Sequence, residues 1–298
     1  MTRRTPAFSV IIPVCNMEAY LAECLDSVLS QDFQDYEIVI VNDGSTDASL
    51  SIISRYMDQD DRLVLIDQAN AGTGPARNAG IKAAKAEGLL FLDADDCLAP
   101  GALDALHQER RKAPCDILIF NGRSFRDADN GRLWDEKPYF DLGPDDENVT
   151  DTGLSWIERT GGQIQQPGMK LYNRQFIVEG RIAFSDACAG EDYYFFYVSM
   201  IHARRVRYFH YQGYCRRYRP GSSVTDLSIR STRQRIASFC CVAATPSLAD
   251  LPKHRRLIAS QHAYYAAVLW VRSMVRTDPE ERNVLLADFR AFGLASYL

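Results

Sequence analysis

The sequence predicts an α/β fold in which a mostly parallel sheet is flanked by helices. In the first hundred of its 298 residues, short apolar runs alternate with amphipathic segments. The apolar runs are continuous, which is typical of parallel strands buried on both faces. Apolar residues make up 46% and charged residues 24% of the chain, as in a soluble globular protein with a packed core.

Strands and helices are expected in regular order through these hundred residues. The helical segments carry apolar positions three or four residues apart, as Leu21, Leu25 and Val28 show. Ser45 is expected to cap the second helix, because its hydroxyl can accept a hydrogen bond from a first-turn N–H. The expected strands are Phe8–Val14, Tyr36–Val41, Leu63–Ile66 and Leu89–Asp93, and the expected helices are Ala19–Ser30, Ser45–Met57 and Gly74–Ala86.

The rest of the chain is expected to extend the sheet and to end in helices. Residues 121–150 are rich in Asp, Gly, Asn and Pro, which predicts a hairpin or an irregular excursion. The pattern is helical from Ile229 onward, so we expect a main domain over residues 1–225 and a C-terminal helical appendage over 226–298. The other expected elements are helices at 101–112, Leu154–Thr160 and Glu191–His202, and strands at Cys115–Phe120, Val206–His210 and Tyr214–Tyr218.

Composition argues against several other classes of protein. No apolar run approaches the roughly 20 residues that span a bilayer. The N-terminus lacks the apolar stretch of a signal peptide, so we expect a cytoplasmic protein. The eight cysteines form no Cys-x-x-Cys pair and no cluster with zinc spacing, so we expect reduced thiols. A net charge of −5 argues against a protein that coats nucleic acid.

One region reverses this acidic balance. Residues 204–256 carry 12 basic side chains against 2 acidic ones, whereas residues 1–100 carry 16 acids against 7 bases. With Trp270 and two neighbouring tyrosines, the basic C-terminal helices are suited to peripheral contact with an anionic membrane surface. A packed helical appendage and a homodimer contact are the alternatives.

Polar groups follow three of the expected strands. The segments Pro13–Glu18, Asn42–Asp43 and Asp93–Asp96 each begin where a strand ends. Ligands of open α/β sheets bind beyond the carboxyl ends of the strands, so these segments are expected to converge on one site. Asp93, Asp95 and Asp96 offer the hard oxygen ligands that Mg²⁺ or Mn²⁺ prefers. A solvated acidic turn that caps the next helix is the alternative.

Two further segments carry weaker signals when taken alone. Asn42–Asp47 reads either as a turn with a capping box or as a site where Asp43 accepts a hydrogen bond from a nucleobase. Asn70–Gly80 opens a helix with glycines and Arg77, an arrangement suited to a phosphate. It lacks the Gly-Lys-Ser/Thr of a Walker A loop and the third glycine of a dinucleotide fingerprint.

The order of these segments resembles the family 2 glycosyltransferases of the GT-A fold. Because the resemblance covers residues 7–100 almost without gaps, it implies a nucleotide-binding half over 1–100 and an acceptor half over 101–225. Cys15 stands where family members usually carry Tyr, which puts the packing beside the base in question. The matching segments are Ser9–Asn16, Glu37–Asp47, Asn70–Gly72, Ala76–Gly80 and Phe91–Asp96.

The resemblance implies a role for particular residues. Asp43 would read the base, most often uracil, and Arg77 would approach the base or the phosphates. Asp93 would contact the ribose, and Asp95, with Asp93, would hold Mn²⁺ or Mg²⁺ on the diphosphate. The remaining residues implied to bind the nucleotide are Pro13, Asn16, Glu18, Asn70 and Ala94.

Glu191 and Asp192 resemble the acidic pair that many of these bacterial enzymes place beside the acceptor. An inverting displacement needs a carboxylate to take the proton of the acceptor hydroxyl. We assign that role to Asp192, with Glu191 as the alternative. Acids in the first turn of a helix are also favoured by the helix dipole without any catalytic role.

Looser matches occur at Gly168–Tyr172 and Tyr218–Ser222. Arg219 or Ser222 would touch the diphosphate or close over the donor, and a structural turn is the alternative. His210 is either an additional metal ligand or a structural residue at a strand end.

Together these features predict a metal-dependent, inverting glycosyltransferase. It would move a sugar from a nucleotide-sugar donor, UDP-linked in most such enzymes, to a glycan or lipid-linked acceptor in polysaccharide biosynthesis. A nucleotidyltransferase is one alternative, but it would need a glycine-rich, basic loop where this chain has Pro13–Tyr20. A non-catalytic subunit that binds a nucleotide-sugar or a glycan is the other.

Overall fold

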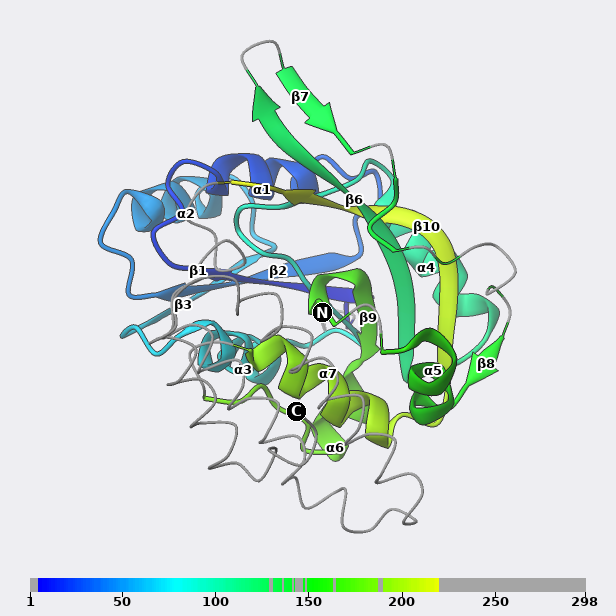
Figure 1. Ribbon diagram of the computed structural model, residues 1–298. Coiled ribbons are helices and arrows are strands. Elements are labelled where there is room, and N and C mark those ends of the chain that lie inside the picture. The colour runs from blue at the N-terminus through cyan, green and yellow to red at the C-terminus, as the bar shows by residue number, and fades with distance from the viewer. Residues whose placement is uncertain are drawn as a thin grey trace, which may run out of the picture.

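The computed structural model describes residues 5–219, except for 129–130, 136, 141, 143–146, 148, 163–164 and 187–189. These residues form one ten-stranded sheet, ordered β3-β2-β1-β4-β9-β6-β10-β5, with β7 paired to β6 and β8 paired to β10. Helices α1 and α2 lie on one face, and α3, α6 and α7 on the other (Figure 1). The predicted α/β class is confirmed.

The N-terminal half has the predicted strand–helix alternation. Strands β1, β2, β3 and β4 pair in parallel, and the apolar side chains of β1 and β2 are buried. Burial of this apolar surface on both faces is the main stabilising contribution to the core. The elements are β1 (Phe8–Val14), α1 (Leu21–Leu29), β2 (Tyr36–Asp43), α2 (Ser49–Met57), β3 (Leu63–Gln68), α3 (Thr73–Ala83) and β4 (Gly88–Phe91).

Two details of this half differ from the prediction. The expected cap Ser45 is wrong, because α2 begins only at Ser49 and Asp47 Oδ1 accepts the hydrogen bond from the Ser49 N–H. Strand β4 ends at Phe91, so Asp93 lies in the turn beyond the strand and not in the strand itself.

The second half mixes parallel and antiparallel pairing. Strands β6 and β10 are parallel, whereas β9 runs antiparallel to both β4 and β6 and joins the two halves of the sheet. Its elements are β5 (Cys97–Leu98), α4 (Ala102–Lys112), β6 (Ile117–Ala128), β7 (Gly131–Trp134), β8 (Thr150–Asp151), α5 (Gly153–Thr160), the 3-10 helix η2 (Pro167–Met169), β9 (Lys170–Asn173), α6 (Arg174–Glu179), α7 (Glu191–His202) and β10 (Val206–Arg217).

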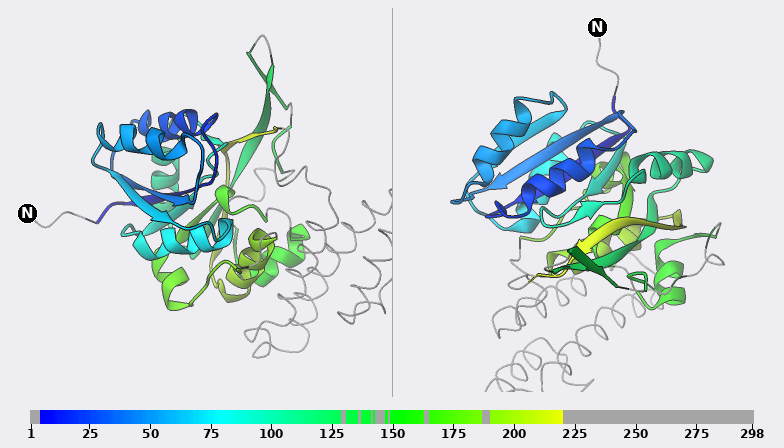
Figure 2. Two further views of the ribbon diagram at one scale, coloured as in Figure 1. Left: turned by 90° about the vertical axis from the view of Figure 1, so that its left-hand side faces the viewer. Right: turned by 90° about the horizontal axis from the view of Figure 1, so that it is seen from above.

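The hairpin of β6 and β7 is the most prominent extension of the sheet. It projects beyond the layer of helices, as Figure 2 shows from two further directions. The sequence predicted a hairpin or an irregular excursion in this region, and the hairpin is confirmed. The two strands predicted near residues 206–218 form one strand, β10, with irregular register between Phe209 and Tyr214.

The predicted C-terminal helical region over 226–298 lies outside the described residues, as do Ser222 and Trp270. The division into domains therefore stays a prediction. Across the described part of the chain, no helix combines the length and the apolar character needed to cross a bilayer.

Candidate active site

Three loops meet at one edge of the parallel strands. Val14, the last residue of β1, pairs with Asn42 of β2, whereas β4 ends at Phe91 opposite Ile11, so all three strands end toward the same edge. The segments that follow these strands therefore lie next to one another, as the sequence predicted from parallel topology. The three predicted clusters therefore follow strands that end at the same edge of the sheet.

Hydrogen bonds join the loop after β1 to the loop after β2. Asn16 has a φ of 54°, and its Oδ1 accepts from the Thr46 N–H at 2.8 Å. Glu18 Oε2 accepts from the Ala48 N–H at 2.8 Å, while the Glu18 N–H donates to Asp47 at 2.9 Å. Asn16 and Glu18 are exposed and Pro13 is half-buried. These contacts give this edge of the site a defined shape.

Asp43 organises the glycine-containing loop that precedes α3. Its carboxylate, on a residue that is 3% exposed, accepts from the Ala71 N–H at 2.9 Å and the Gly72 N–H at 2.8 Å. Gln68 Nε2 also donates to it at 2.8 Å, and Asn70 Nδ2 donates to the Asp43 carbonyl at 3.0 Å. A carboxylate accepts about four hydrogen bonds, so capacity for a further donor such as a base N–H remains.

Arg77 connects the turn after β4 with the start of α7. Its Nη2 donates to Asp93 at 2.7 Å, and its Nη1 donates to Asp192 at 2.6 Å and to Glu191 at 3.2 Å. The side chain is 3% exposed, and its guanidinium lies 5.1 Å from the Phe184 ring centre. Residues more than a hundred positions apart thus form one charged cluster.

The charged groups of this cluster shift one another's pKa values. Burial lowers the pKa of Arg77, but the carboxylates of Asp192, Asp93 and Glu191 outweigh it and raise that pKa, so the guanidinium stays charged. Burial and the Asp192 charge raise the pKa of Glu191 to about 7, against the opposing effect of Arg77. Burial also raises the pKa of Asp192. One carboxyl of the pair therefore titrates near neutral pH.

Asp192 is the more accessible member of the acidic pair. Its side chain is 32% exposed, compared with 13% for Glu191. Both residues stand in the first turn of α7, and Gly190 precedes them in the left-handed conformation. A molecule bound at the surface therefore reaches Asp192 more readily than Glu191.

A buried lysine adjoins this pair and was not among the predicted site residues. Lys170 is fully buried, its Nζ donates to the Gln166 carbonyl at 2.7 Å, and its ammonium lies 5.1 Å from the Phe196 ring centre. Burial lowers its pKa to about 7, against the opposing charge of Asp192. Two sequence signals pointed to Lys170: it interrupts the otherwise apolar Met169–Tyr172 run, and it lies in the loosely matching segment Gly168–Tyr172.

The three acids of the Asp93–Asp96 turn have different surroundings. Asp96 is 4% exposed and accepts from the Tyr214 hydroxyl at 2.6 Å and the Arg217 N–H at 2.7 Å, so it ties the turn to β10. Asp93 pairs with Arg77, and Asp95 Oδ2 accepts from Arg219 Nε at 2.6 Å. Ala94 between them is buried. Only Asp93 and Asp95 remain at the edge of the site.

The carboxylates of this turn could supply some, but not all, of the ligands that a divalent cation needs. Magnesium usually binds through one or two carboxylates together with substrate phosphates, and not in an all-protein cage. Within the described residues, no group of three His, Cys, Asp or Glu side chains is arranged around a common point, and the ring of His210 instead lies 3.4 Å from the Tyr208 hydroxyl. Asp93 and Asp95 each have one carboxylate oxygen without a hydrogen bond from the described residues. Those oxygens suit a cation shared with a diphosphate.

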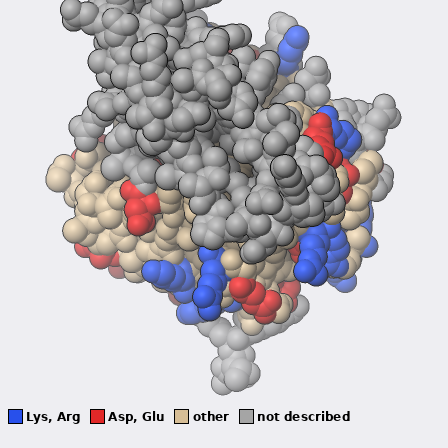
Figure 3. All heavy atoms as spheres, turned by 60° about the horizontal axis from the view of Figure 1, so that its bottom comes forward, with Lys and Arg blue, Asp and Glu red and all other residues tan. Residues whose placement is uncertain are grey.

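The described arginines of the basic region are largely paired with acids. Arg207 pairs with buried Glu109, Arg217 with Glu23 at 2.6 Å and Arg219 with Asp95. Figure 3 shows one face, where Lys and Arg side chains lie in separate groups among Asp and Glu side chains. This part of the basic region therefore stabilises the fold. Membrane contact by the C-terminal helices concerns residues outside the described range and stays a prediction.

Comparison with known proteins places these residues in a family. The model of the family described as Glycosyl transferase family 2 matches residues 9–180. The chain is 31% identical over 221 residues to Glycosyltransferase GlyA of Streptococcus pneumoniae, which covers 72% of this chain and 31% of GlyA. It is 33% identical over 219 residues to Putative glycosyltransferase EpsH of Bacillus subtilis, which covers 68% of this chain and 58% of EpsH. The chain thus spans less than two thirds of the length of these curated relatives.

Solved structures share the fold. S. aureus TarS 1–349 in complex with UDP-GlcNAc superposes with a TM-score of 0.77 at 22% identity, over 97% of this chain and 81% of that one. Mannosyltransferase PcManGT from Pyrobaculum calidifontis, in complex with GDP-Man and Mn²⁺, superposes with a TM-score of 0.59 at 16% identity, over 98% of this chain and 81% of that one. At these identities the likeness establishes the fold alone.

Proposed function

The chain belongs to glycosyl transferase family 2, and from this we propose that it transfers a sugar from a nucleotide-sugar donor to a hydroxyl of a glycan or lipid-linked acceptor in polysaccharide biosynthesis. The observation that carries the proposal is the Arg77 cluster. It joins Asp93, on the donor side, to Asp192, at the start of α7, through contacts of 2.7 and 2.6 Å. A donor and a base for the acceptor would then occupy one site.

The nucleotide would lie along the carboxyl edge of β1, β2 and β4. Asp43 would accept a base N–H, and Asp93 would bind the ribose. The pocket around the nucleotide would be lined by Pro13, Asn16, Glu18, Asn70 and Ala94. We assign uracil as the base because the UDP-GlcNAc complex of TarS has the more similar fold, with GDP-sugars as the alternative that the PcManGT complex represents.

In the proposed reaction, Asp192 accepts the proton of the acceptor hydroxyl while that oxygen attacks the anomeric carbon opposite the departing diphosphate. Burial raises the pKa of Asp192, so its ionised carboxylate binds a proton more strongly than an exposed carboxylate does. Arg77 orients the carboxylate through its 2.6 Å hydrogen bond and moderates that rise. Attack from the opposite side inverts the configuration of the sugar.

Asp95 and Asp93 would hold Mn²⁺ or Mg²⁺ against the diphosphate. When bound, the cation supplies electrostatic stabilisation of the charge that develops on the leaving group. Arg219 now occupies one oxygen of Asp95 and can contribute a second positive charge beside the phosphates.

The test is a panel of nucleotide-sugars incubated with the full chain and Mn²⁺, with release of the nucleoside diphosphate as the readout. We expect release from at least one UDP-sugar and its loss in Asp192→Asn. Release of pyrophosphate from a nucleoside triphosphate and a sugar phosphate would instead identify a nucleotidyltransferase. Thermal stabilisation without any release, in the presence of acceptor glycans, would identify a binding subunit.

A further inference from the structure

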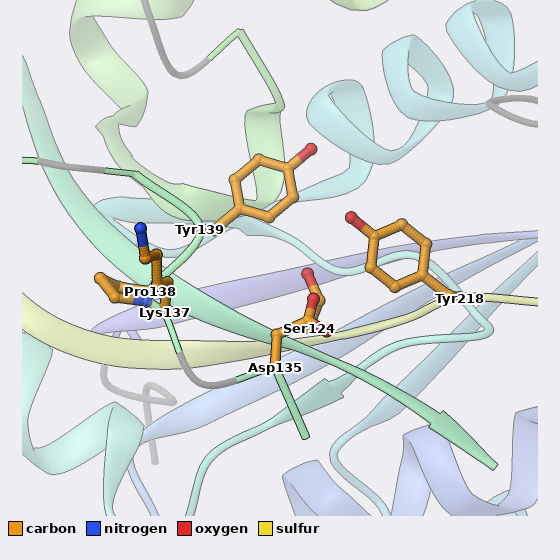
Figure 4. A pocket seen from close by; sticks show the side chains of 6 residues that line it. All are labelled: Ser124, Asp135, Lys137, Pro138, Tyr139 and Tyr218. Atoms are coloured by element: carbon orange, nitrogen blue, oxygen red, sulfur yellow. The ribbon is translucent and has the colours of Figure 1, made fainter. Parts of the chain in front are cut away.

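A pocket beside the β6–β7 hairpin has no role in the function proposed above. It has a volume of about 660 Å³, in the range of ligand pockets. Figure 4 shows the rings of Tyr139 and Tyr218 entering the same space from two sides, with Ser124 and Asp135 between them. Its described lining consists of Ser124, Asp135, Lys137, Pro138, Tyr139 and Tyr218.

Arg216 holds the two aromatic walls in place. Its Nη1 donates to the Tyr139 hydroxyl at 2.9 Å. Its guanidinium lies 5.1 Å from the Tyr139 ring centre and 4.9 Å from the Tyr218 ring centre. Cation–π contacts of this kind fix aromatic rings without covering both of their faces. Tyr218 is 40% exposed, so part of its ring is accessible to a ligand.

The end of β10 and the residues that follow it contact both the pocket and the proposed active site. Arg217 Nε donates to the Asp95 carbonyl at 3.0 Å, and Arg219 Nε donates to the Asp95 carboxylate. The residues between and before them contact the pocket instead, because Arg216 lies over the ring of Tyr218. Successive side chains of an extended segment point to opposite sides, which explains why these residues contact different surroundings in turn. The segment is still extended at Tyr218, whose N–H donates to the Phe125 carbonyl at 2.7 Å. Burial raises the pKa of Tyr139, against the opposing charge of Arg216.

The chemistry of the lining favours a sugar over a nucleotide. A pyranose presents C–H bonds on its faces and hydroxyls around its edge, which match aromatic walls with a few polar groups. The hydroxyls can donate to Asp135 and accept from Lys137 or Ser124. A phosphate would need an excess of positive charge in the pocket. The lining instead contains the Asp135 carboxylate as well as Lys137, and Arg216 already contacts the two tyrosine rings.

We propose that this pocket binds a pyranose unit of the acceptor glycan. The proposal rests on the transferase function proposed above and adds the place where the acceptor binds. It assigns Tyr218 and Tyr139 as specificity-determining residues for the acceptor. The donor would bind at the edge of the parallel strands, on the other side of Asp93–Asp96.

Saturation-transfer NMR of the full chain tests this binding site. The probes are methyl glycosides of glucose, galactose, mannose and N-acetylglucosamine, and the variants are Tyr218→Ala and Asp135→Asn. Tyr211→Ala is the matched control, because Tyr211 is on the same strand but contacts Pro100 and lines no part of the pocket. We expect at least one glycoside to bind the wild type, and affinity to fall by about tenfold or more in Tyr218→Ala but not in the control.

The absence of binding by every glycoside, or equal binding by the wild type and both pocket variants, would overturn the proposal. Parallel titrations of the wild-type protein with UDP and with GDP separate this failure from failure of the proposed function. UDP binding without glycoside binding would refute the acceptor pocket alone. Glycoside binding at the pocket without binding of any nucleotide would refute the transferase function and leave a saccharide site.

Discussion

At the scale of single residues, Arg77 determines the electrostatics of the site. One buried guanidinium is shared by Asp93, Glu191 and Asp192 at 2.6–3.2 Å. Three carboxylates placed this close together, at a partly buried site, would be costly to ionise without such a partner. Arg77 thereby keeps a potential base at the start of α7 in a state that can accept a proton.

Replacing the proposed base tests whether Asp192 acts in the transfer step and not in donor binding. Asp192→Asn keeps the size of the side chain but removes the carboxylate that takes the proton. We expect the turnover rate to fall by roughly 10²–10⁴-fold while UDP affinity changes little. Kinetics of UDP release combined with UDP titration measure both quantities. Turnover that is unchanged in Asp192→Asn but abolished in Glu191→Gln would assign the base to Glu191.

Ionisation of Glu191 should make the stability of the folded chain depend on pH. Its pKa rises from 4.5 to about 7 in the folded chain, mainly through burial and the Asp192 charge. The stability contributed by its protonated form is complete below pH 4.5 and is lost as the pH rises through about 7. We therefore expect the melting temperature of Glu191→Gln, relative to the wild type, to rise across this window. A difference that does not vary with pH would show that Glu191 titrates normally.

At the scale of elements, the contact between α3 and the segment before α7 sets the geometry of the Arg77 cluster. Gly74 lies in the first turn of α3, three residues before Arg77. A Cβ atom at Gly74 would lie 2.3 Å from the Ser185 carbonyl oxygen and 3.4 Å from Glu191 Cβ. The absence of a side chain there permits the close approach that brings the acids to Arg77.

Gly74→Ala should therefore affect stability and activity together. Relief of the clash moves α3 away from Ser185 and lengthens the contacts of Arg77 with Glu191 and Asp192. We expect a loss of about 1–3 kcal/mol in the free energy of unfolding and a fall in turnover. Thr73→Ala, at the exposed preceding position, is the matched control and should change neither. Wild-type turnover in Gly74→Ala would mean that the spacing of α3 and α7 does not control the base.

At the scale of the whole molecule, parallel topology explains why the donor side could be predicted from the sequence. Continuous apolar runs identified β1, β2, β3 and β4, and parallel strands place their carboxyl ends at one edge. The antiparallel strand β9 and helix α6 were not predicted. Strand β9 has four residues and is held by pairing with β4 and β6, so its local sequence carries little signal.

The partners of the site residues were harder to predict than their positions. Arg77 was expected to approach the base or the phosphates, but the pairing with Asp192 depends on how α3 packs against the second half of the chain. The burial of Lys170 and the pairing of Arg219 with Asp95 depend in the same way on contacts between distant segments. Spacing along the chain contains no information about such contacts.

The central claim is that Asp93 and Asp95 bind one divalent cation together with the diphosphate of the donor. Calorimetric titration of UDP, with Mn²⁺ and with a chelator, measures this coupling most directly in the wild type and in Asp95→Asn. We predict that Mn²⁺ tightens UDP binding by about tenfold or more in the wild type and has little effect in Asp95→Asn. Equal UDP affinity of the wild-type protein with Mn²⁺ and with the chelator would contradict the claim.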